Sequence, residues 1–266
     1  RMYSVALIPC LLAAIISDQT CLAWGIGHTH YHVAGLIPEG SPLHLAPLQL
    51  DLLSLTALIG ICSGLTSLLF ADLTHALQQQ FRRLVPHPVL RPAVGGICVL
   101  GLMLLVGNRD YLGLGVTAPD EGAVTIVSCF RPGGALWWSW LAKLLFTSVT
   151  LSSGFKGGEV TPLFFIGAAL GNMLATQLGF PVDFGAALGF LAVFSGATNT
   201  PLACTLMGIE LFGGEYAVYF GVACTLAYLF SGHSGIYPAQ RIQAPKIDST
   251  RLPNGSTLRN AVPPAG

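Results

Sequence analysis

Long windows without a charged side chain are the feature that most constrains the fold of this chain. Residues 160–182, 184–209 and 216–240 contain no Asp, Glu, Lys or Arg, and each window is longer than twenty residues. Residues 52–71 and 92–108 form two shorter windows of the same kind. A helix needs roughly 20 consecutive apolar residues to cross a bilayer. The pattern therefore predicts an all-α protein that crosses the membrane several times.

Composition supports a membrane protein and gives no reason to expect nucleic acid as a partner. Only 9% of the 266 residues are charged, whereas soluble domains average about 25%. The twelve basic and twelve acidic residues cancel, so no excess of positive charge is available to bind phosphates. The seven cysteines contain no C-x-x-C pair, which predicts buried structural thiols.

Apolar segments and turn residues predict where the helices lie. We expect helices over residues 3–22, 52–81, 134–152, 162–178, 183–198, 200–212, 215–230 and 236–242. Residues 107–116 are expected to form a tight loop. Pro162 and Pro201 suit the first turns of helices that are capped by Thr161 and Thr200. Several of these helices are too short to cross a bilayer alone.

Basic residues predict the orientation in the membrane. One group follows the long helix and another follows the last apolar window: Arg82, Arg83 and Arg91, then Arg241, Lys246 and Arg251. By the positive-inside rule both groups lie in the cytoplasm, as does the C-terminus. We expect residues 1–50 to hold one helix and a His-rich connection, 51–242 to form the main helical body, and 243–266 to be a disordered cytoplasmic tail. Since the first residue is Arg rather than Met, we also expect the chain to lack its natural beginning.

A carboxylate stands out because it lies in an apolar, glycine-rich stretch, GFKGGEVTPLFF, at residues 154–165. Broken helices inside a membrane are tolerated where they line a cavity, and in transporters their amino-terminal ends point at anions. Gly157 and Gly158 would let the backbone approach a ligand closely. The helix that follows offers free amides and a partial positive charge, and Thr161 adds a hydroxyl donor. The stretch therefore predicts an anion site.

Glu159, within this stretch, suggests proton transfer. A carboxylate in hydrocarbon costs several kcal/mol unless it is protonated or paired. Beside a bound anion its ionised form is penalised further, so it could carry a proton. The alternative is an ion pair with Lys156 at a water-exposed loop. Glu210 and Glu215 flank a helix end and are expected to be structural residues at the membrane edge.

Four histidines lie near the N-terminus: His28, His30, His32 and His44. Alternating imidazoles in an extended strand could bind zinc, and a membrane metalloenzyme that uses them with Glu159 is a distant alternative. A polar loop at the membrane surface is the preferred interpretation. We therefore expect neither a metal nor a cofactor, and no enzymatic activity.

Three stretches resemble the CLC chloride channel and transporter family. SGFKGGEVTPLFFIGAALGN (153–172) resembles its second pore signature, usually G-x-F-x-P preceded by Gly. Gly158 and Pro162 are kept here, whereas Val160 stands at the place of the Phe. FSGATNTPLACTLMGIELFG (194–213) resembles the next helix pair, and SGIYPAQRI (234–242) resembles the last helix, which carries a pore tyrosine, here Tyr237. The likeness covers nearly the whole chain up to the tail.

The departures from the family pattern look most like its fluoride-exporting branch, which exchanges fluoride for protons. They are the Glu and Thr of GEVTP, together with WGIGHTHYHV at residues 24–33. This resemblance implies that the amides of Glu159 and Val160 contact the anion, supported by Gly157, Gly158 and Pro162 at the helix end. It also implies that Thr161 and Tyr237 supply hydroxyls and that Glu159 couples protons. A chloride channel or a chloride/proton antiporter is the alternative.

The resemblance further implies an architecture of two inverted repeats, of which this chain holds the last helix of the first and all of the second. The first repeat's signatures, G-S-G-I-P-like and G-K/R-E-G-like, are absent, and the second of them carries the gating glutamate. We therefore expect a fragment that is inactive alone. The full-length protein is expected to be a multi-pass homodimer in the cell membrane, with one pore in each subunit.

Overall fold

The computed structural model describes residues 4–26, 31, 33, 49–116, 118, 122–237, 240 and 246, and over these residues every regular element is helical. The all-α fold predicted from the sequence is therefore confirmed. The chain divides into two units, residues 1–31 and 32–266. The first unit contains α1 (Ser4–Ala23), which matches the helix expected over residues 3–22 to within one residue at each end.

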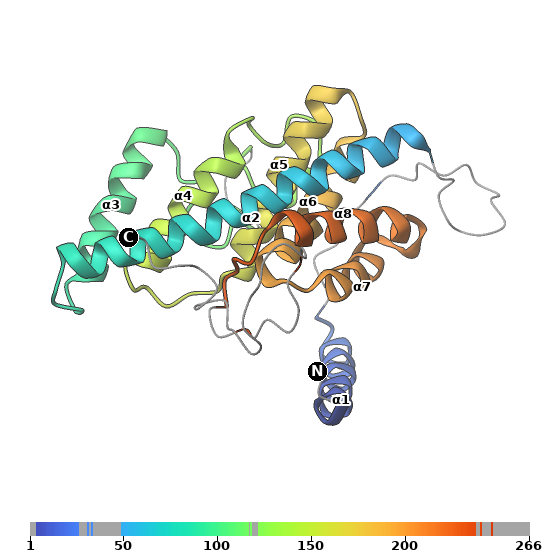
Figure 1. Ribbon diagram of the computed structural model, residues 1–266, viewed down its shortest axis with the longest axis horizontal. Helices are drawn as coiled ribbons and strands as arrows, with labels where there is room; N and C mark the ends of the chain where they lie inside the picture. The colour runs from blue at the N-terminus through green and yellow to red at the C-terminus, as the bar shows by residue number, and fades with distance from the viewer. Residues whose placement is uncertain are drawn as a thin grey trace. The chain divides into compact units, whose positions relative to one another are not determined.

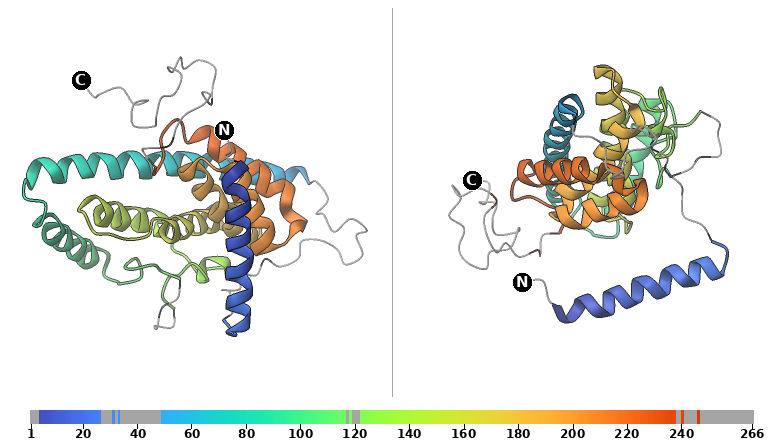
Figure 2. Two further views of the ribbon diagram at one scale, coloured as in Figure 1. Left: turned by 90° about the horizontal axis from the view of Figure 1, so that it is seen from below. Right: turned by 90° about the vertical axis from the view of Figure 1, so that its right-hand side faces the viewer.

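The second unit holds the remaining described helices (Figure 1). They are α2 (Leu50–Leu84), α3 (Arg91–Val106), α4 (Ser139–Ser152), α5 (Val160–Leu178), α6 (Val182–Thr198), α7 (Pro201–Phe212) and α8 (Ala217–Phe230), with 3-10 turns η1 (Ser128–Phe130) and η2 (Gly214–Tyr216). The long helix α2 packs against α4, α5, α6 and α8, so it connects most of the unit. After α2 the chain turns back into α3, as Figure 2 shows.

Two of the described helices, α2 and α5, are long and apolar enough to cross a membrane, and five further apolar helices are shorter. The shortest are only 12 to 14 residues long, including α7 and α8. At 1.5 Å per residue, such a helix spans about 20 Å, which is less than the hydrocarbon core of a bilayer. The expectation that several helices cannot cross alone is confirmed.

Two of the expected helices differ clearly from the structure, one in its start and one in its presence. The helix expected to begin at residue 134 begins at Ser139, because residues 134–138 form bends and turns, with the N–H of Leu136 donating to Ser139 Oγ at 3.0 Å and the N–H of Ser139 donating to the Leu136 carbonyl at 3.0 Å. The helix expected over residues 236–242 is absent at Ile236, Tyr237 and Gln240, and its other residues lie outside the described part of the chain. There the N–H of Ile236 donates to the carbonyl of Ala197 on α6.

The closest helix contact joins α5 to α6 through glycines. A Cβ on Gly167 would lie 2.2 Å from the carbonyl oxygen of Gly189, and one on Gly171 would lie 1.9 Å from that of Gly185. Each helix thus contributes a G-x-x-x-G pair, Gly167/Gly171 and Gly185/Gly189, to the same crossing. Small residues at this spacing let two helix backbones touch in a membrane protein. The crossing fixes the position of α5 relative to α6.

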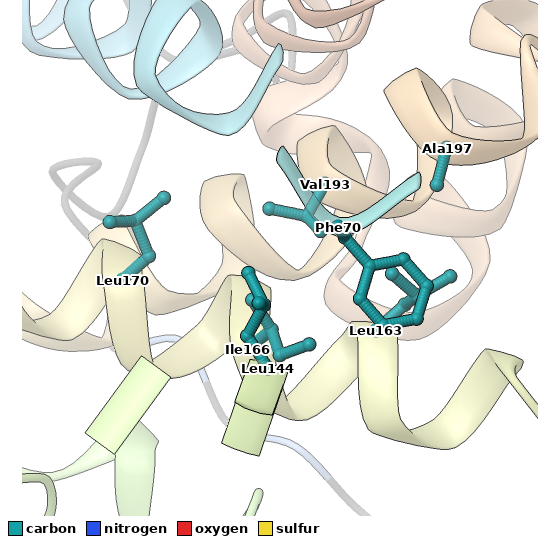
Figure 3. Close-up of a cluster of buried hydrophobic side chains, with 7 residues drawn as sticks. All are labelled: Phe70, Leu144, Leu163, Ile166, Leu170, Val193 and Ala197. Atoms are coloured by element: carbon teal, nitrogen blue, oxygen red, sulfur yellow. The ribbon is translucent and has the colours of Figure 1, made fainter. Parts of the chain in front are cut away.

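An apolar cluster joins four helices near this crossing (Figure 3). Its buried members are Phe70 of α2, Leu144 of α4, Leu163, Ile166 and Leu170 of α5, and Val193 and Ala197 of α6. Ile236 packs against it from the segment after α8. The amino-terminal turns of α5 and the C-terminal end of α6 therefore meet in one core, together with the residue that precedes Tyr237.

A buried lysine anchors the loop that was expected at residues 107–116. Lys143 of α4 is fully buried, and its Nζ donates to the carbonyls of Tyr111 at 3.1 Å and Gly113 at 2.7 Å. The ammonium also lies 5.1 Å from the centre of the Phe165 ring on α5. Two carbonyls and a ring face compensate in part for removing the charge from water. Lys143 thereby joins the loop to both α4 and α5.

We predict that Gly167→Val severely destabilises the protein, because the added atoms would collide with the backbone of α6, which cannot give way as a side chain can. The expected loss in the free energy of unfolding is about 3 kcal/mol, the upper end of the usual cost of overpacking, measured by thermal unfolding in detergent. The control is Gly101→Ala on α3, where a Cβ would meet nothing within 4 Å. Equal unfolding temperatures for both variants would contradict the glycine contact.

Candidate functional site

The amino-terminal end of α5 differs from the sequence expectation in one respect. The helix begins at Val160 with Glu159 at the N-cap, so the predicted cap at Thr161 is wrong. The cause is that Glu159 has helical dihedral angles, φ −92° and ψ −21°, and its carbonyl already accepts the N–H of Leu163 at 3.3 Å. Thr161 is therefore the second residue of the helix, and Pro162 lies in the first turn as expected.

This helix end has free donors and no side-chain cap. The N–H groups of Val160 and Thr161 have no acceptor within the helix, because the carbonyls that would pair with them lie before its start. Pro162 has no N–H, and the Glu159 side chain makes no capping hydrogen bond. The N–H of Glu159 at the N-cap, which the resemblance also assigns to the anion, has no acceptor within the helix either. Three amides and the positive end of the helix dipole are thus available to an acceptor.

Gly157 and Gly158 precede this end in an exposed stretch. A Cβ on either would meet nothing within 4 Å, and neither has a positive φ. Packing among the described residues therefore does not require glycine at these positions. The expectation that they admit a ligand near the backbone stays a prediction.

Glu159 is half-buried at this helix end, whereas Lys156 is exposed. No ion pair joins these two side chains in the part of the chain that the structure describes. The alternative that Glu159 serves as the partner of Lys156 is therefore not supported by the geometry. A half-buried carboxylate lies beside free amide donors instead.

Tyr237 lies in the stretch that follows α8. We call its described residues 234–237 and 240 the Tyr237 segment. Of the Tyr237 side chain, 49% is exposed. Its neighbour Ile236 donates its N–H to Ala197 at 3.0 Å and packs against the cluster that contains Leu163. The structure therefore brings the Tyr237 segment to the same core as the first turns of α5. No hydrogen bond joins Tyr237 to Glu159 or Thr161 in the described structure, so the pore role of its hydroxyl stays a prediction.

Sequence reasoning missed Asn199, the residue that links α6 to the Tyr237 segment. Asn199 is the C-cap of α6 and adopts left-handed dihedral angles, φ 59° and ψ 38°. Its Nδ2 donates to Gln240 Oε1 at 3.2 Å and to the carbonyl of Ser234 at 3.4 Å. An Asn directly after an apolar helix, followed by Thr-Pro, is a helix-stop signal that could have indicated this position. The next helix, α7, does begin with Thr200 at the N-cap and Pro201 in its first turn, as predicted.

No group of three or more His, Cys, Asp or Glu side chains that could hold a metal occurs within the residues that the structure describes. His28, His30, His32 and His44 lie outside those residues. The described site therefore offers amides, hydroxyls and one carboxylate. This donor set suits a small anion that can move with a proton.

Comparison with known proteins identifies what this arrangement resembles. The family described as "Voltage gated chloride channel" matches residues 1–232. A "Chloride/fluoride channel protein" of Pseudomonas syringae pv. tomato is 45% identical over 248 residues, which cover 91% of this chain and 51% of the relative. A "Voltage-gated ClC-type chloride channel ClcB" of Escherichia coli is 29% identical over 187 residues, covering 65% of this chain and 42% of the relative.

A solved structure agrees with these matches. The crystal structure of a CLC-type fluoride/proton antiporter superimposes with a TM-score of 0.75 at 32% identity, covering 88% of this chain and 55% of that chain. The chain thus spans about half the length of this antiporter and of the Pseudomonas relative.

Proposed function

This chain belongs to the voltage gated chloride channel (CLC) family, and from that membership we propose that it forms the C-terminal half of a transporter that exports fluoride in exchange for protons. The observation that carries the proposal is the uncapped amino-terminal end of α5, where Glu159 lies beside the free amides of Val160 and Thr161. CLC proteins are integral membrane transporters rather than enzymes, so these groups bind and release an ion without a chemical conversion.

The donor set at α5 favours fluoride over larger halides. Fluoride is small, strongly hydrated and a strong hydrogen-bond acceptor, so a site must replace its water with strong, closely placed donors. Backbone amides at a helix end provide charge-complementary donors without a basic side chain. The hydroxyl of Thr161 adds a donor beside these amides. Chloride, which is larger and accepts weaker hydrogen bonds, gains less from these groups.

Glu159 is proposed to couple protons to fluoride movement. Its carboxyl is half-buried, and it forms neither a helix-capping bond nor an ion pair with Lys156. A fluoride ion near the same amides would repel the ionised carboxylate and favour its protonated form. Binding of the anion and uptake of a proton at this site would then promote one another, which links the movement of the two ions.

We assign this activity to the full-length transporter, meaning this chain together with the first repeat that its relatives contain. The proposed protein is a homodimer in the cell membrane with its C-terminus in the cytoplasm. Because the chain spans about half the length of the relatives, it provides half of a pore and should not transport by itself. Fluoride efflux from liposomes that contain this chain alone, above that of empty liposomes, would contradict this part of the proposal.

The test of the function is a comparison of anions. We predict that liposomes with the full-length transporter release fluoride faster than chloride, and that fluoride efflux is accompanied by proton uptake. An ion-selective electrode and a pH-sensitive dye measure the two movements. Equal or faster chloride efflux would favour the chloride channel or chloride/proton antiporter instead.

A second prediction concerns the hydroxyl of Thr161. Thr161→Val keeps the shape and the backbone amide but removes one donor, so the fluoride affinity of the full-length transporter should fall by about tenfold, the scale of one hydrogen bond. Isothermal titration with fluoride measures this change. Thr176→Val is the matched control, because Thr176 is exposed near the other end of the same helix. The proposal fails here if both variants bind fluoride equally well.

The sharpest prediction is for Glu159→Gln, which keeps the size of the side chain but cannot titrate. Proton uptake into fluoride-loaded liposomes should fall to background while the unfolding temperature stays near that of the wild type. A passive fluoride leak is expected to remain, because the amides of Val160 and Thr161 are unchanged. Wild-type proton coupling in this variant would remove Glu159 from the mechanism and leave it as a structural carboxylate.

A further inference from the structure

A cluster of hydrogen bonds at the C-terminal ends of α6 and α8 connects Lys246 to the Tyr237 segment. We call this cluster the Lys246 clasp, and it consists of Asn199, Tyr228, Ser231, Gln240 and Lys246. The Nζ of Lys246 donates to Asn199 Oδ1, to the carbonyl of Tyr228 at 2.7 Å and to Ser231 Oγ at 2.9 Å. It also lies 4.1 Å from the centre of the Tyr228 ring. All three ammonium protons therefore have an acceptor.

The position of Lys246 suits a cation. Asn199 is the C-cap of α6 and Ser231 is the C-cap of α8, so the ammonium lies where two helices end. Helix C-termini carry a partial negative charge and unpaired carbonyls. Burial lowers the pKa of Lys246 to about 8, so the amine remains mostly protonated near neutral pH. The positive charge of Lys246 is thus attracted to the two helix ends, and no carboxylate is among its described contacts.

The clasp also fixes which way the Asn199 amide faces. A lysine ammonium can only donate, so the atom of Asn199 that faces it must be the oxygen. The amide nitrogen then points to the other side, where it donates to the carbonyl of Ser234 and to Gln240 Oε1. These two residues flank Tyr237. The carbonyl of Ser234 and Gln240 Oε1 can only accept from Asn199, so they favour the same amide orientation, and Lys246 holds its oxygen side.

Other bonds hold the same segment at its two ends but do not replace Asn199. Ser234 Oγ donates to Asp72 Oδ1 at 3.0 Å, and the N–H of Ile236 donates to Ala197. After Tyr237 in the sequence, Gln240 Nε2 donates to the carbonyl of Thr198 at 3.3 Å. The Asn199 amide is the group that contacts both sides of Tyr237 at once.

We propose that Lys246 is a positioning residue for transport: by binding Asn199 Oδ1, it orients the amide that holds the Tyr237 segment at the anion site. This inference rests on the proposed function for the role of Tyr237 as a pore residue. It assigns a role to a lysine that lies after the last helix, in the part of the sequence that was expected to be a disordered tail.

The test uses two variants of the full-length transporter. Lys246→Met removes the charge and keeps the length of the stem. Asn199→Asp keeps an oxygen for Lys246, and adds a negative charge that should strengthen that contact, but it removes both donors to the Tyr237 segment. If Lys246 only stabilises the fold, Asn199→Asp should leave the placement of Tyr237 unchanged, because the contact with Lys246 is kept. If Lys246 acts through the Asn199 amide, Asn199→Asp should change the placement of Tyr237. Arg83→Met, which removes an exposed cation from the end of α2, is the control.

Two readouts separate this inference from the proposed function. Nitration of Tyr237 by tetranitromethane, followed by mass spectrometry, reports the placement of the ring, and fluoride efflux reports transport. We expect faster nitration and about tenfold slower efflux in both variants, the scale of one lost hydrogen bond to the anion. Arg83→Met should match the wild type in both readouts.

The outcomes are distinguishable. If Tyr237 in Asn199→Asp is nitrated at the wild-type rate, the positioning role is overturned, whatever the rate of efflux. This variant decides the question even if Lys246→Met does not fold. Faster nitration with unchanged efflux would support the clasp and contradict the pore role of Tyr237. In the background of Tyr237→Phe, Lys246→Met should slow efflux little further, because the hydroxyl that it positions is already gone.

Discussion

The direct contact of the α5 and α6 backbones is the constraint on which the rest of the second unit depends. Gly167 and Gly189 approach so closely that a single methyl group on either would overlap the carbonyl of the other. Because this contact sets the position of the two helices relative to each other, it also sets how the start of α5 lies relative to the end of α6. The apolar cluster around Leu163 and Ala197 then fills the space between these ends and α2 and α4.

The proposed anion site follows from that arrangement. The first turn of α5 has free amides because nothing caps it, and the end of α6 holds the Tyr237 segment through Ala197 and Asn199. A helix that begins inside a membrane must have its first amides satisfied by some partner. The proposal that this partner is a fluoride ion, with Glu159 as the proton carrier, connects the geometry with the family to which the chain belongs.

Much of the fold could be predicted from the sequence, and the failures have either a local cause or a tertiary one. Charge-free windows located α2, α5, α6, α7 and α8 because helices in lipid must be apolar over their length. The cap of α5 was misplaced because Thr before Pro usually precedes a helix, whereas here the backbone of Glu159 is already helical. The helix expected near Tyr237 is missing at its described residues, where the N–H of Ile236 bonds to the end of α6, a tertiary contact that no local pattern records. The Lys246 clasp was missed for the same reason, since its members lie far apart in the sequence.

The central claim is that the amides at the start of α5 bind the transported anion, and NMR spectroscopy of the full-length transporter tests it most directly. With ¹⁵N-labelled valine and threonine, a fluoride titration follows the amide resonances of Val160 and Thr161. The account predicts large, saturable shifts of these two resonances that chloride reproduces only weakly, while Val182 at the start of α6 stays unchanged. Resonances of Val160 and Thr161 that do not respond to fluoride, in a protein that transports it, would contradict the account.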